Sequence, residues 1–400
     1  MGDPRVYLRV KLGANGEMDV GPAISRIDIQ DEDRGTDKAT LVMDDHVGIA
    51  TDVIQRNVPV TIEMGWETEH AVLFAGRVHN IGSYTRSGET GRLQFEVRDL
   101  SELLNVRPTI ANRQHSGSLR VILTQLASEA NLMIGAVAID PMPSWPDSHA
   151  RLLEQGDRTN WQLIQDVARD YGARAFVEVN VPPGAPTTTP PVSLLYFYSE
   201  DAMLAEQPLG KLTLCHGWGS LINFQIMRVG TGATPSSAAD VIDPTTGEVS
   251  TETAPAPAAP PPAPAISGSA LDQITAARGE GAARSAETGL EVTSAAVTPR
   301  ADAAVPARVV GTPSDPDLAR RRVRPDQTRA LGLSARGLAM GTVFLRAKAS
   351  VEIEGHSSEA DGRWYLKRVN HIIEQSRAAD AAATAQMTVK TYRTSFEATR

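Results

Sequence analysis

The chain has 400 residues, a formal net charge of −9 and a single cysteine, Cys215. A chain of this length is too long for a single hydrophobic core, so roughly two to four compact units are expected. One cysteine excludes an intramolecular disulfide framework. The negative charge, without a basic stripe interleaved with aromatic residues, excludes sequence-specific nucleic-acid binding, and the lack of a long apolar run or leader segment predicts a protein made in the cytoplasm with no membrane insertion.

Residues 1–105 alternate apolar and polar side chains, which is typical of strands with one buried face. The expected strands are residues 6–12, 24–29, 39–43, 58–63, 74–81 and 93–98. An acidic turn, Asp31–Gly35, follows the second strand, and a segment of helical period, Ile49–Gln55, precedes the fourth. The pattern predicts a first β domain over 1–105.

Residues 106–204 change to an α/β pattern. Ser118 is placed to cap a first helix, and Thr159 and Gln162 have the spacing of a capping box that starts a second helix, which Gly172 ends. The apolar residues expected to face inward are Leu119, Ile122, Leu123, Leu126, Ala130, Trp161, Ile164, Ala168 and Tyr171. The strands expected next are residues 173–179 and 192–198. This segment therefore predicts a small inserted α/β domain.

Residues 233–334 have a different composition. Residues 254–265 contain only alanine and proline, and few apolar residues elsewhere in the segment show a sustained period. Such a segment buries too little apolar surface to offset its ordering entropy, so we expect an extended insert over most of its length. A basic helix, Leu318–Arg324, is expected near its end. A passive tether and a strap that binds a partner are equally compatible with this composition.

A second β domain is expected from residues 205–232 together with 335–400, because the latter repeat the first domain. Strands are expected at 211–214 and 222–229. Without a gap, Val60, Ile62, Arg77, Val78 and Ile81 overlay Val351, Ile353, Arg368, Val369 and Ile372. One extra residue in the next loop then brings Gln94 and Val97 onto Gln386 and Val389. We interpret this match as a duplicated β unit, although any two amphipathic hairpins of similar length would share part of it.

Histidine and cysteine side chains give no convincing catalytic or metal site. Cys215 and His216 are neighbours, but adjacent residues on a strand point to opposite faces. His79 and His371 fall one position apart in the overlay, and we interpret them as polar residues on a strand face or at an interface. His46 has no second histidine at a ligand spacing.

Three charged or glycine-rich runs also fall short of known motifs. Asp31–Asp33 lacks the alternation and the final glutamate of a calcium loop, and Gly230–Gly232 lacks the third glycine and the helix of a phosphate-binding loop. Arg320–Arg324 is compatible with a solvated helix face or with a contact to another subunit or a phosphate. No catalytic residue, cofactor-binding residue or metal ligand is predicted. A pair of carboxylates suited to glycoside cleavage is not excluded, because two such residues come together only when the chain folds.

Four segments carry a resemblance to a known family. They are Phe74–Ile81 (F-x-G-x-V-x-x-I), Asp157–Gly172 (T-N-W followed by an apolar helix and glycine), Val241–Gly247 (D-P-x-T-G) and Gly362–His371 (G-x-W-x-L-x-x-V-x-H). In this order they resemble the late-control-D family, the baseplate hub proteins of contractile phage tails, and the similar trunk of type VI secretion spikes. The resemblance covers most of the chain except the insert rich in alanine and proline.

The resemblance implies an α+β, mostly β fold, with two similar antiparallel, barrel-like tube domains around the inserted α/β domain. It implies a homotrimer whose two β domains per chain alternate in a pseudo-sixfold ring. The expected partners are a trimeric spike protein, a hexameric tail tube protein, baseplate wedge or other inner baseplate proteins, and the tape measure protein. The expected location is the tail baseplate of a virion or of an extracellular contractile particle, assembled in the bacterial cytoplasm. Because no repetitive spike sequence follows the second β copy, the spike is expected to be a separate protein.

This reading predicts a structural protein with no enzymatic activity and no cofactor. The first alternative is a cell-wall-degrading baseplate enzyme, which a peptidoglycan zymogram would reveal. The second is a secreted effector carried by the machine, which predicts a stable monomer. The sequence leaves open whether the particle is a phage tail or a related injection system.

Overall fold

The computed structural model describes residues 5–13, 16–44, 54–85, 87, 91–108, 113–145, 152–180, 191–214, 220–228, 237–242, 249–253, 307–308, 333–357, 360–377 and 388–400. It divides into two compact units, of which the first comprises Met1–Val229 with Asp326–Arg400 and the second Gly230–Pro325.

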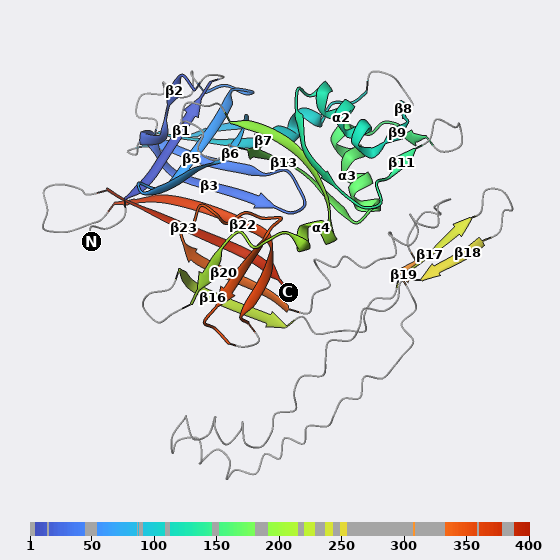
Figure 1. The fold of residues 1–400 in the computed structure, drawn as a ribbon. Helices are drawn as coiled ribbons and strands as arrows, with labels where there is room; N and C mark the ends of the chain where they lie inside the picture. The colour runs from blue at the N-terminus through green and yellow to red at the C-terminus, as the bar shows by residue number, and fades with distance from the viewer. Residues whose placement is uncertain are drawn as a thin grey trace, which may run out of the picture. The chain divides into compact units, whose positions relative to one another are not determined.

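Strands predominate in the first unit, and the expected α+β, mostly β class is confirmed. A curled 13-stranded sheet forms most of it (Figure 1). The strands from the first part of the chain are β1 (Val6–Leu12), β2 (Met18–Asp19), β3 (Ile24–Glu32), β4 (Lys38–Asp44), β5 (Pro59–Trp66), β6 (Glu69–Tyr84) and β7 (Arg92–Asp99). Those from the later part are β15 (Lys211–Thr213), β16 (Leu221–Arg228), β20 (Leu333–Met340), β21 (Ser350–Glu354), β22 (Gly362–Arg377) and β23 (Thr388–Thr399).

The two sets of strands have the same order in space. The first runs β1-β5-β6-β7-β4-β3 and the second β15-β21-β22-β23-β20-β16. When the two-residue strand β2, which pairs with β1, is left out and the others are numbered along the chain within each set, both sets read 1-4-5-6-3-2. The sets differ in the first strand, since β1 is antiparallel to β5 whereas β15 is parallel to β21. A shared order of six strands is stronger support for duplication than a match of short sequence segments.

The sequence overlay that places Val97 of the third repeated strand onto Val389 is wrong. Val78 in β6 pairs with Val97 in β7, whereas Val369 in β22 pairs with Phe396, and Val389 pairs with Ser376 instead. The reason is the length of the hairpin. The ladder closes between Tyr84 and Arg92 in the first set, but between Arg377 and Thr388 in the second, so the returning strand enters later in the sequence.

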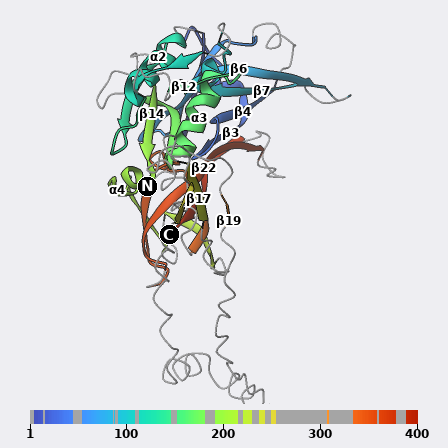
Figure 2. The same cartoon turned by 90° about the vertical axis from the view of Figure 1, so that its right-hand side faces the viewer.

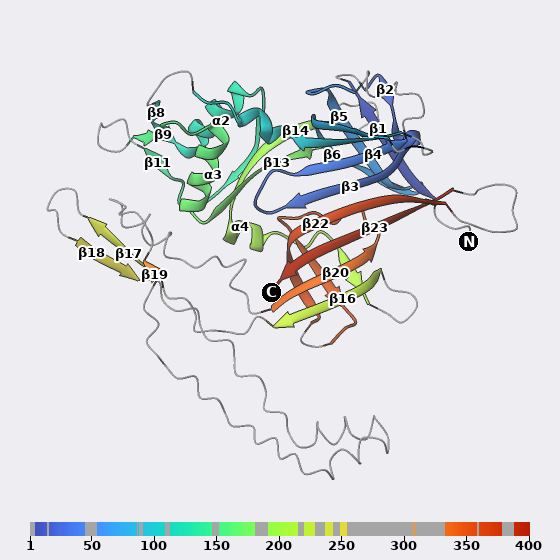
Figure 3. The same ribbon diagram turned by 180° about the vertical axis from the view of Figure 1, so that it is seen from behind.

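One pair of strands joins the two sets into a single sheet. The first residues of β22 pair with β21, and its later residues, Arg368–Glu374, pair with β3 (Figure 3). Salt bridges support both ends of this pair: Arg368 lies 2.9 Å from Glu32, and Arg26 lies 3.7 Å from Glu374. β3 is longer than the sequence pattern indicated, because it continues through Asp31 to Glu32 where an acidic turn was expected.

Two apolar clusters fill the concave parts of this sheet. The first contains the inward-facing residues of β1 to β7, such as Phe95, and also takes Ile373 and Tyr392 from the second set. The other surrounds Trp364 and is built from β15, β16 and β20 to β23. Alternation of buried and exposed side chains along each strand explains both, since every second residue faces inward.

The inserted segment forms a third apolar cluster and has its own small sheet. Its backbone is drawn in teal and green in Figure 2. Its helices are α2 (Leu119–Glu129), α3 (Asn160–Asp170) and α4 (Glu200–Ala205), and its sheet contains β10 (Met133–Ala138), β13 (Ala173–Asn180) and β14 (Val192–Ser199). Two short strand pairs complete it, namely β8 (Gln114–His115) with β12 (Leu153–Glu154) and β9 (Gly117–Ser118) with β11 (Ser144–Trp145). Ser118 caps α2 and Thr159 with Gln162 forms a capping box at α3, as predicted. All residues expected to face inward are buried except Tyr171, which is half-buried and packs against the cluster.

The second unit contains β17 (Ser237–Ile242), β18 (Val249–Thr253) and β19 (Ala307–Arg308), which form a three-stranded sheet. The other predictions on this part of the chain lie outside the described residues. They are the extended stretch 254–265, the basic helix 318–324 and the glycines of 230–232. Most of the expected helix at 49–55, His46, Cys215 and His216 also lie outside them.

Candidate functional site: a buried charge cluster

A lysine with unusual backbone geometry lies in the connection between β20 and β21. Lys348 has φ = 66°, in the left-handed region that residues other than glycine rarely adopt. Its backbone N–H donates to the carbonyl of Leu366 in β22 at 2.9 Å, and its side chain is only 2% exposed. A conformation of this kind costs on the order of 1 kcal/mol or more, so the surrounding contacts must hold it in place.

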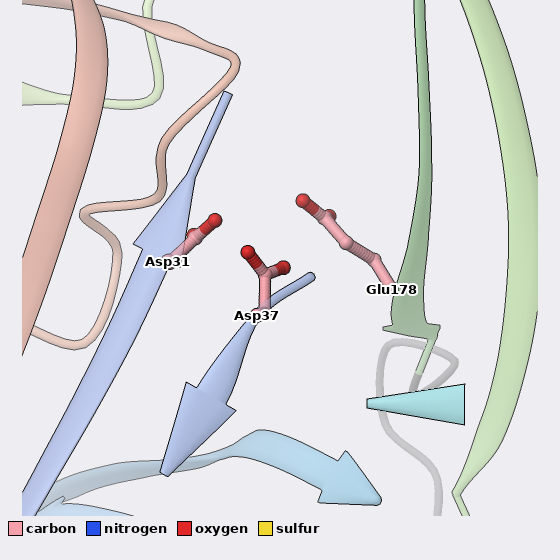
Figure 4. A group of neighbouring side chains, drawn as sticks. All are labelled: Asp31, Asp37 and Glu178. Carbon is pink, nitrogen blue, oxygen red and sulfur yellow. The ribbon is translucent and has the colours of Figure 1, made fainter. Parts of the chain in front are cut away.

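Three carboxylates surround the ammonium group of this lysine. Nζ of Lys348 lies 2.5 Å from Asp31, 2.8 Å from Asp37 and 3.3 Å from Glu178. Asp31 comes from β3, Asp37 from the turn before β4, and Glu178 from β13 of the inserted segment, and Figure 4 shows the three side chains converging. With Asp99 we name these residues the Lys348 cluster. It therefore ties together both sets of strands and the insert.

Backbone donors and a serine complete the cluster. The second oxygen of Asp31 accepts from the N–H of Ala347 at 2.9 Å. Asp99, at the end of β7, accepts from the N–H of Asp37 at 3.3 Å and from the N–H of Ser101 at 3.0 Å. The carbonyl of Asp37 in turn accepts from the N–H of Asp99 at 3.0 Å. These bonds hold the carboxylates of Asp31 and Asp99 in place.

The pKa values in the cluster move in opposite directions. Burial opposes ionisation of Asp31, but the charges on Lys348 and Arg346 outweigh it and lower the pKa of this carboxyl. Burial raises the pKa of Asp37 well above its usual range, and raises that of Asp99 to about 7. Burial also opposes the charge of Lys348, yet Asp31 and Asp37 overcome it and raise the lysine pKa. The ammonium therefore stabilises the ionised form of Asp31, while burial favours the neutral forms of Asp37 and Asp99.

A second buried ion pair lies between the insert and the first strand set. Arg174 of β13 lies 2.5 Å from Glu200 and 3.8 Å from Asp33, and all three side chains are less than 10% exposed. Tyr365 of β22 packs nearby with Phe176 and Met203 in a small apolar cluster. Burial raises the pKa of Tyr365. The insert is thus joined to the sheet by charge and by apolar contacts.

The arrangement suits a cation, and an ammonium group already occupies it. Oxygens of Asp31, Asp37 and Glu178 lie within 4.8 Å of one another, a spacing that could hold a metal ion. Nζ of Lys348 bonds to all three, so in this arrangement the lysine supplies the positive charge. Asp31 and Asp37 are 3% and 6% exposed, which keeps them out of reach of a polymer substrate. The cluster can therefore hold together the three parts of the chain that carry these side chains, which are the two strand sets and the insert.

The histidines singled out in the sequence have separate environments. His371 lies on the strand β22, as interpreted from the sequence, but it is fully buried on the inward face. Its Nε2 donates to the carbonyl of Leu345 at 3.0 Å, and Nδ1 accepts from the hydroxyl of Tyr392 at 2.8 Å. Burial lowers the pKa of His371 to about 3. His79 is half-buried on β6, where its Nδ1 lies 3.6 Å from Glu102.

Sequence reasoning missed the Lys348 cluster. It treated Asp31 as part of a turn, although Asp31 continues the buried face of Ile27 and Ile29 at a spacing of two residues. An acidic residue on the inward face of an alternating strand is the one signal that the sequence offered. Lys348 and Glu178 gave none, because their contacts depend on how distant segments meet.

Comparison with solved structures finds similar folds. A tail protein from Neisseria meningitidis MC58 has a TM-score of 0.58 at 11% identity, covering 99% of this chain and 97% of that chain. The 43 kDa tail protein of prophage MuSo2 from Shewanella oneidensis has a TM-score of 0.59 at 12% identity, covering 99% and 98%. The E. coli c3393 protein, described as a component of the type VI secretion system, has a TM-score of 0.52 at 10% identity, covering 99% and 76%.

The chain therefore has the fold of these tail proteins over nearly its whole length, which confirms at the level of fold the resemblance carried by its motifs. No family model and no curated protein sequence matches it. Among the described helices, none combines the length and apolar character needed to cross a membrane.

Proposed function

Because the chain shares its fold with phage tail proteins, we propose that it is the structural baseplate hub of a contractile tail or injection machine. Three copies form a ring with pseudo-sixfold symmetry, which joins the hexameric tail tube to a trimeric spike. Baseplate wedge or other inner baseplate proteins and the tape measure protein are the further partners. The ring acts at the baseplate of a virion or of an extracellular contractile particle.

The repeated strand order is the observation that carries this proposal. Two sets of six strands share one order within a single chain. Three chains then present six similar lobes, so a hexameric tube can repeat its contacts six times on one face. The opposite face needs only the true threefold axis for a trimeric spike. A chain with one such set would not reconcile the two symmetries.

The proposed division into domains follows the apolar clusters. Residues 1–105 form the first tube-like domain, 106–204 the inserted domain, and 205–232 with 335–400 the second tube-like domain, while 233–334 form the insert. Each of the first three contains most of one apolar cluster. The sheet is continuous across the first and the last of these domains, so we expect them to move as one body.

The proposed role is non-enzymatic. In the Lys348 cluster, the lysine charge favours the ionised form of Asp31, and burial favours the protonated forms of Asp37 and Asp99. General acid and base catalysis requires groups that reach a substrate and exchange protons with it. A structural hub requires interface area instead, and permanent interfaces of this kind usually bury more than about 2,000 Å².

Light scattering tests the proposal. The purified chain is expected to have the mass of a trimer, either alone or after mixing with the spike protein encoded for the same particle. A dimer, or a monomer that persists at high concentration with the spike present, contradicts it. A peptidoglycan zymogram with a clear lytic band would favour the enzymatic alternative.

A further inference from the structure

The hydroxyl of one buried tyrosine has no hydrogen-bond partner in the described part of the chain. Tyr365 lies on β22 and is 2% exposed, and its Oη is buried away from every donor and acceptor among the described residues. A buried polar atom without a partner destabilises the folded state, and such atoms are rare in native proteins. The surroundings of this hydroxyl therefore indicate what its partner is.

Two elements of the insert place charged residues beside this tyrosine. The ring of Tyr365 packs with Phe176 of β13 and Met203 of α4. Arg174 lies two residues before Phe176, on the same face of β13, and Glu200 lies one helical turn before Met203. The Tyr365 side chain thus lies against the side of the insert that carries Arg174 and Glu200.

The first strand set contributes a buried carboxylate to the same place. Asp33 follows β3, and its N–H donates at 2.8 Å to the carbonyl of Lys367, two residues beyond Tyr365 on β22. The Asp33 residue is 5% exposed. Burial raises the pKa of Tyr365, the charge of Asp33 raises it further, and the charge of Arg174 lowers it. The positions of these charges agree with a hydroxyl directed toward the Arg174–Asp33 pair.

The ion pair beside the hydroxyl is longer than a direct hydrogen bond. Nε of Arg174 lies 3.8 Å from Oδ2 of Asp33, whereas a direct N–H···O bond measures about 2.7–3.2 Å. The same guanidinium contacts Glu200 at 2.5 Å through Nη2. Polar groups separated by more than about 3.5 Å are commonly bridged by water. A third polar group can therefore take part in the contact between Arg174 and Asp33.

Charge and burial restrict the kind of ligand that fits. Arg174 and Arg34 carry two formal positive charges, and Asp33 and Glu200 carry two formal negative charges. Because these charges balance, neither an anion nor a cation gains from entering. The side chains of Arg174, Asp33 and Glu200 are less than 10% exposed, which excludes a larger molecule. A small neutral molecule that both donates and accepts hydrogen bonds fits, and water is such a molecule.

We propose that a single buried water molecule binds between Tyr365, Arg174 and Asp33. The water accepts from the Nε–H of Arg174 and donates to Oδ2 of Asp33, and the hydroxyl of Tyr365 provides its third bond. Buried waters in proteins typically make about three such bonds. The three side chains come from β22, from β13 of the insert and from the residue after β3, so the water joins the insert to both strand sets. This inference goes beyond the hub proposal and does not depend on the number of copies in the ring.

A crystal structure of the purified chain that resolves ordered solvent tests the site directly. The expected result is an isolated density peak within hydrogen-bond distance of Oη of Tyr365, Nε of Arg174 and Oδ2 of Asp33. Density at this place that belongs to another side chain of the protein overturns the proposal. So does a map that shows ordered water elsewhere but no peak here.

The substitution Tyr365→Phe gives a second and independent test, because it removes only the hydroxyl. A hydroxyl that is bonded to water contributes to stability, so the urea midpoint of the variant is expected to fall. A hydroxyl without any partner costs stability, so its removal would raise the midpoint or leave it unchanged. The direction of the shift therefore distinguishes the two states of the hydroxyl.

Two other tyrosines provide matched controls for this substitution. The buried Tyr392 donates directly to Nδ1 of His371 at 2.8 Å, so Tyr392→Phe is expected to lower the midpoint. Tyr84 is 60% exposed, so Tyr84→Phe is expected to leave it unchanged. A midpoint of Tyr365→Phe that falls, as for Tyr392→Phe, supports the water site. A midpoint that rises, or that stays unchanged as for Tyr84→Phe, overturns it and leaves the hub proposal intact.

Discussion

The ammonium of Lys348 lies 2.5 Å from the carboxylate of Asp31, although the two residues are 317 positions apart in the sequence. Both side chains are buried, and they come from the two different strand sets. This bond therefore forms only when both sets are in place, and the bond from Lys348 to Glu178 adds the insert. The contact makes the stability of each part depend on the others.

Replacing Lys348 with methionine removes the positive charge that contacts Asp31, Asp37 and Glu178. Methionine keeps much of the volume, but it leaves the carboxylates buried without their partner. Breaking a buried ion pair in this way usually costs roughly 3–5 kcal/mol. Urea unfolding followed by tryptophan fluorescence is expected to show a loss of this size.

Lys211→Met is the matched control for this substitution. Lys211 makes a salt bridge with Glu354 across β15 and β21, but both side chains are more than 40% exposed. Exposed pairs of this kind contribute little. The urea midpoint of this variant is expected to stay unchanged. Equal losses in the two variants would contradict the role of the buried cluster.

Asp99 is expected to make the protein less stable as the pH rises from 5 to 8. Burial raises the pKa of Asp99 to about 7, so the folded state holds a proton that the unfolded state releases near pH 4. The stabilisation is complete below the unfolded pKa and is lost as pH rises through about 7, with a slope of at most about 1.4 kcal/mol per pH unit. Asp99→Asn cannot ionise and should decline less over this range in urea midpoints. Parallel pH profiles of the variant and the parent would show that Asp99 does not titrate there.

His371 is expected to produce the opposite slope in acid. Its folded pKa is lowered to about 3 by burial, whereas an unfolded histidine titrates near 6.5. The unfolded state thus binds the proton first, so stability is complete above about pH 6.5 and falls as the pH drops toward 3. His371→Gln should remove part of this acid sensitivity, whatever its effect at neutral pH. A variant that loses stability between pH 6.5 and 4 as steeply as the parent would contradict the prediction.

Trp161→Ala should destabilise the inserted domain. Trp161 is 7% exposed in the cluster that α2 and α3 share, and truncation of a core tryptophan costs roughly 3–5 kcal/mol. Val121→Ala is the control, because Val121 is 57% exposed on α2. Denaturant melts should show a loss below about 0.5 kcal/mol for the control. A loss below about 1 kcal/mol for Trp161→Ala would show that the tryptophan is not a core residue.

The elements set by local chemistry could be predicted from the sequence. The capping box of Thr159 and Gln162 starts α3 where expected, and alternation found β1 at residues 6–12. The overlay of Val97 with Val389 failed because the sequence does not contain the register of a long hairpin. Register is set by the turn and by which face is buried, and these depend on the whole sheet.

The Lys348 cluster could be predicted only in part. Asp31 lies on the inward face of a strand whose pattern is visible in the sequence. The left-handed backbone of Lys348 and its distance from Asp37 depend on how β3 meets β22, which no local pattern encodes. The strand order that supports the hub proposal is likewise a property of the assembled sheet.

Class averages from electron microscopy of the purified ring, alone or with its spike, measure the proposed symmetry directly. Two strand sets of the same order per chain and three chains predict a threefold ring with six similar lobes around its lumen. A ring of any other symmetry, or a twofold dimer, would contradict the hub proposal.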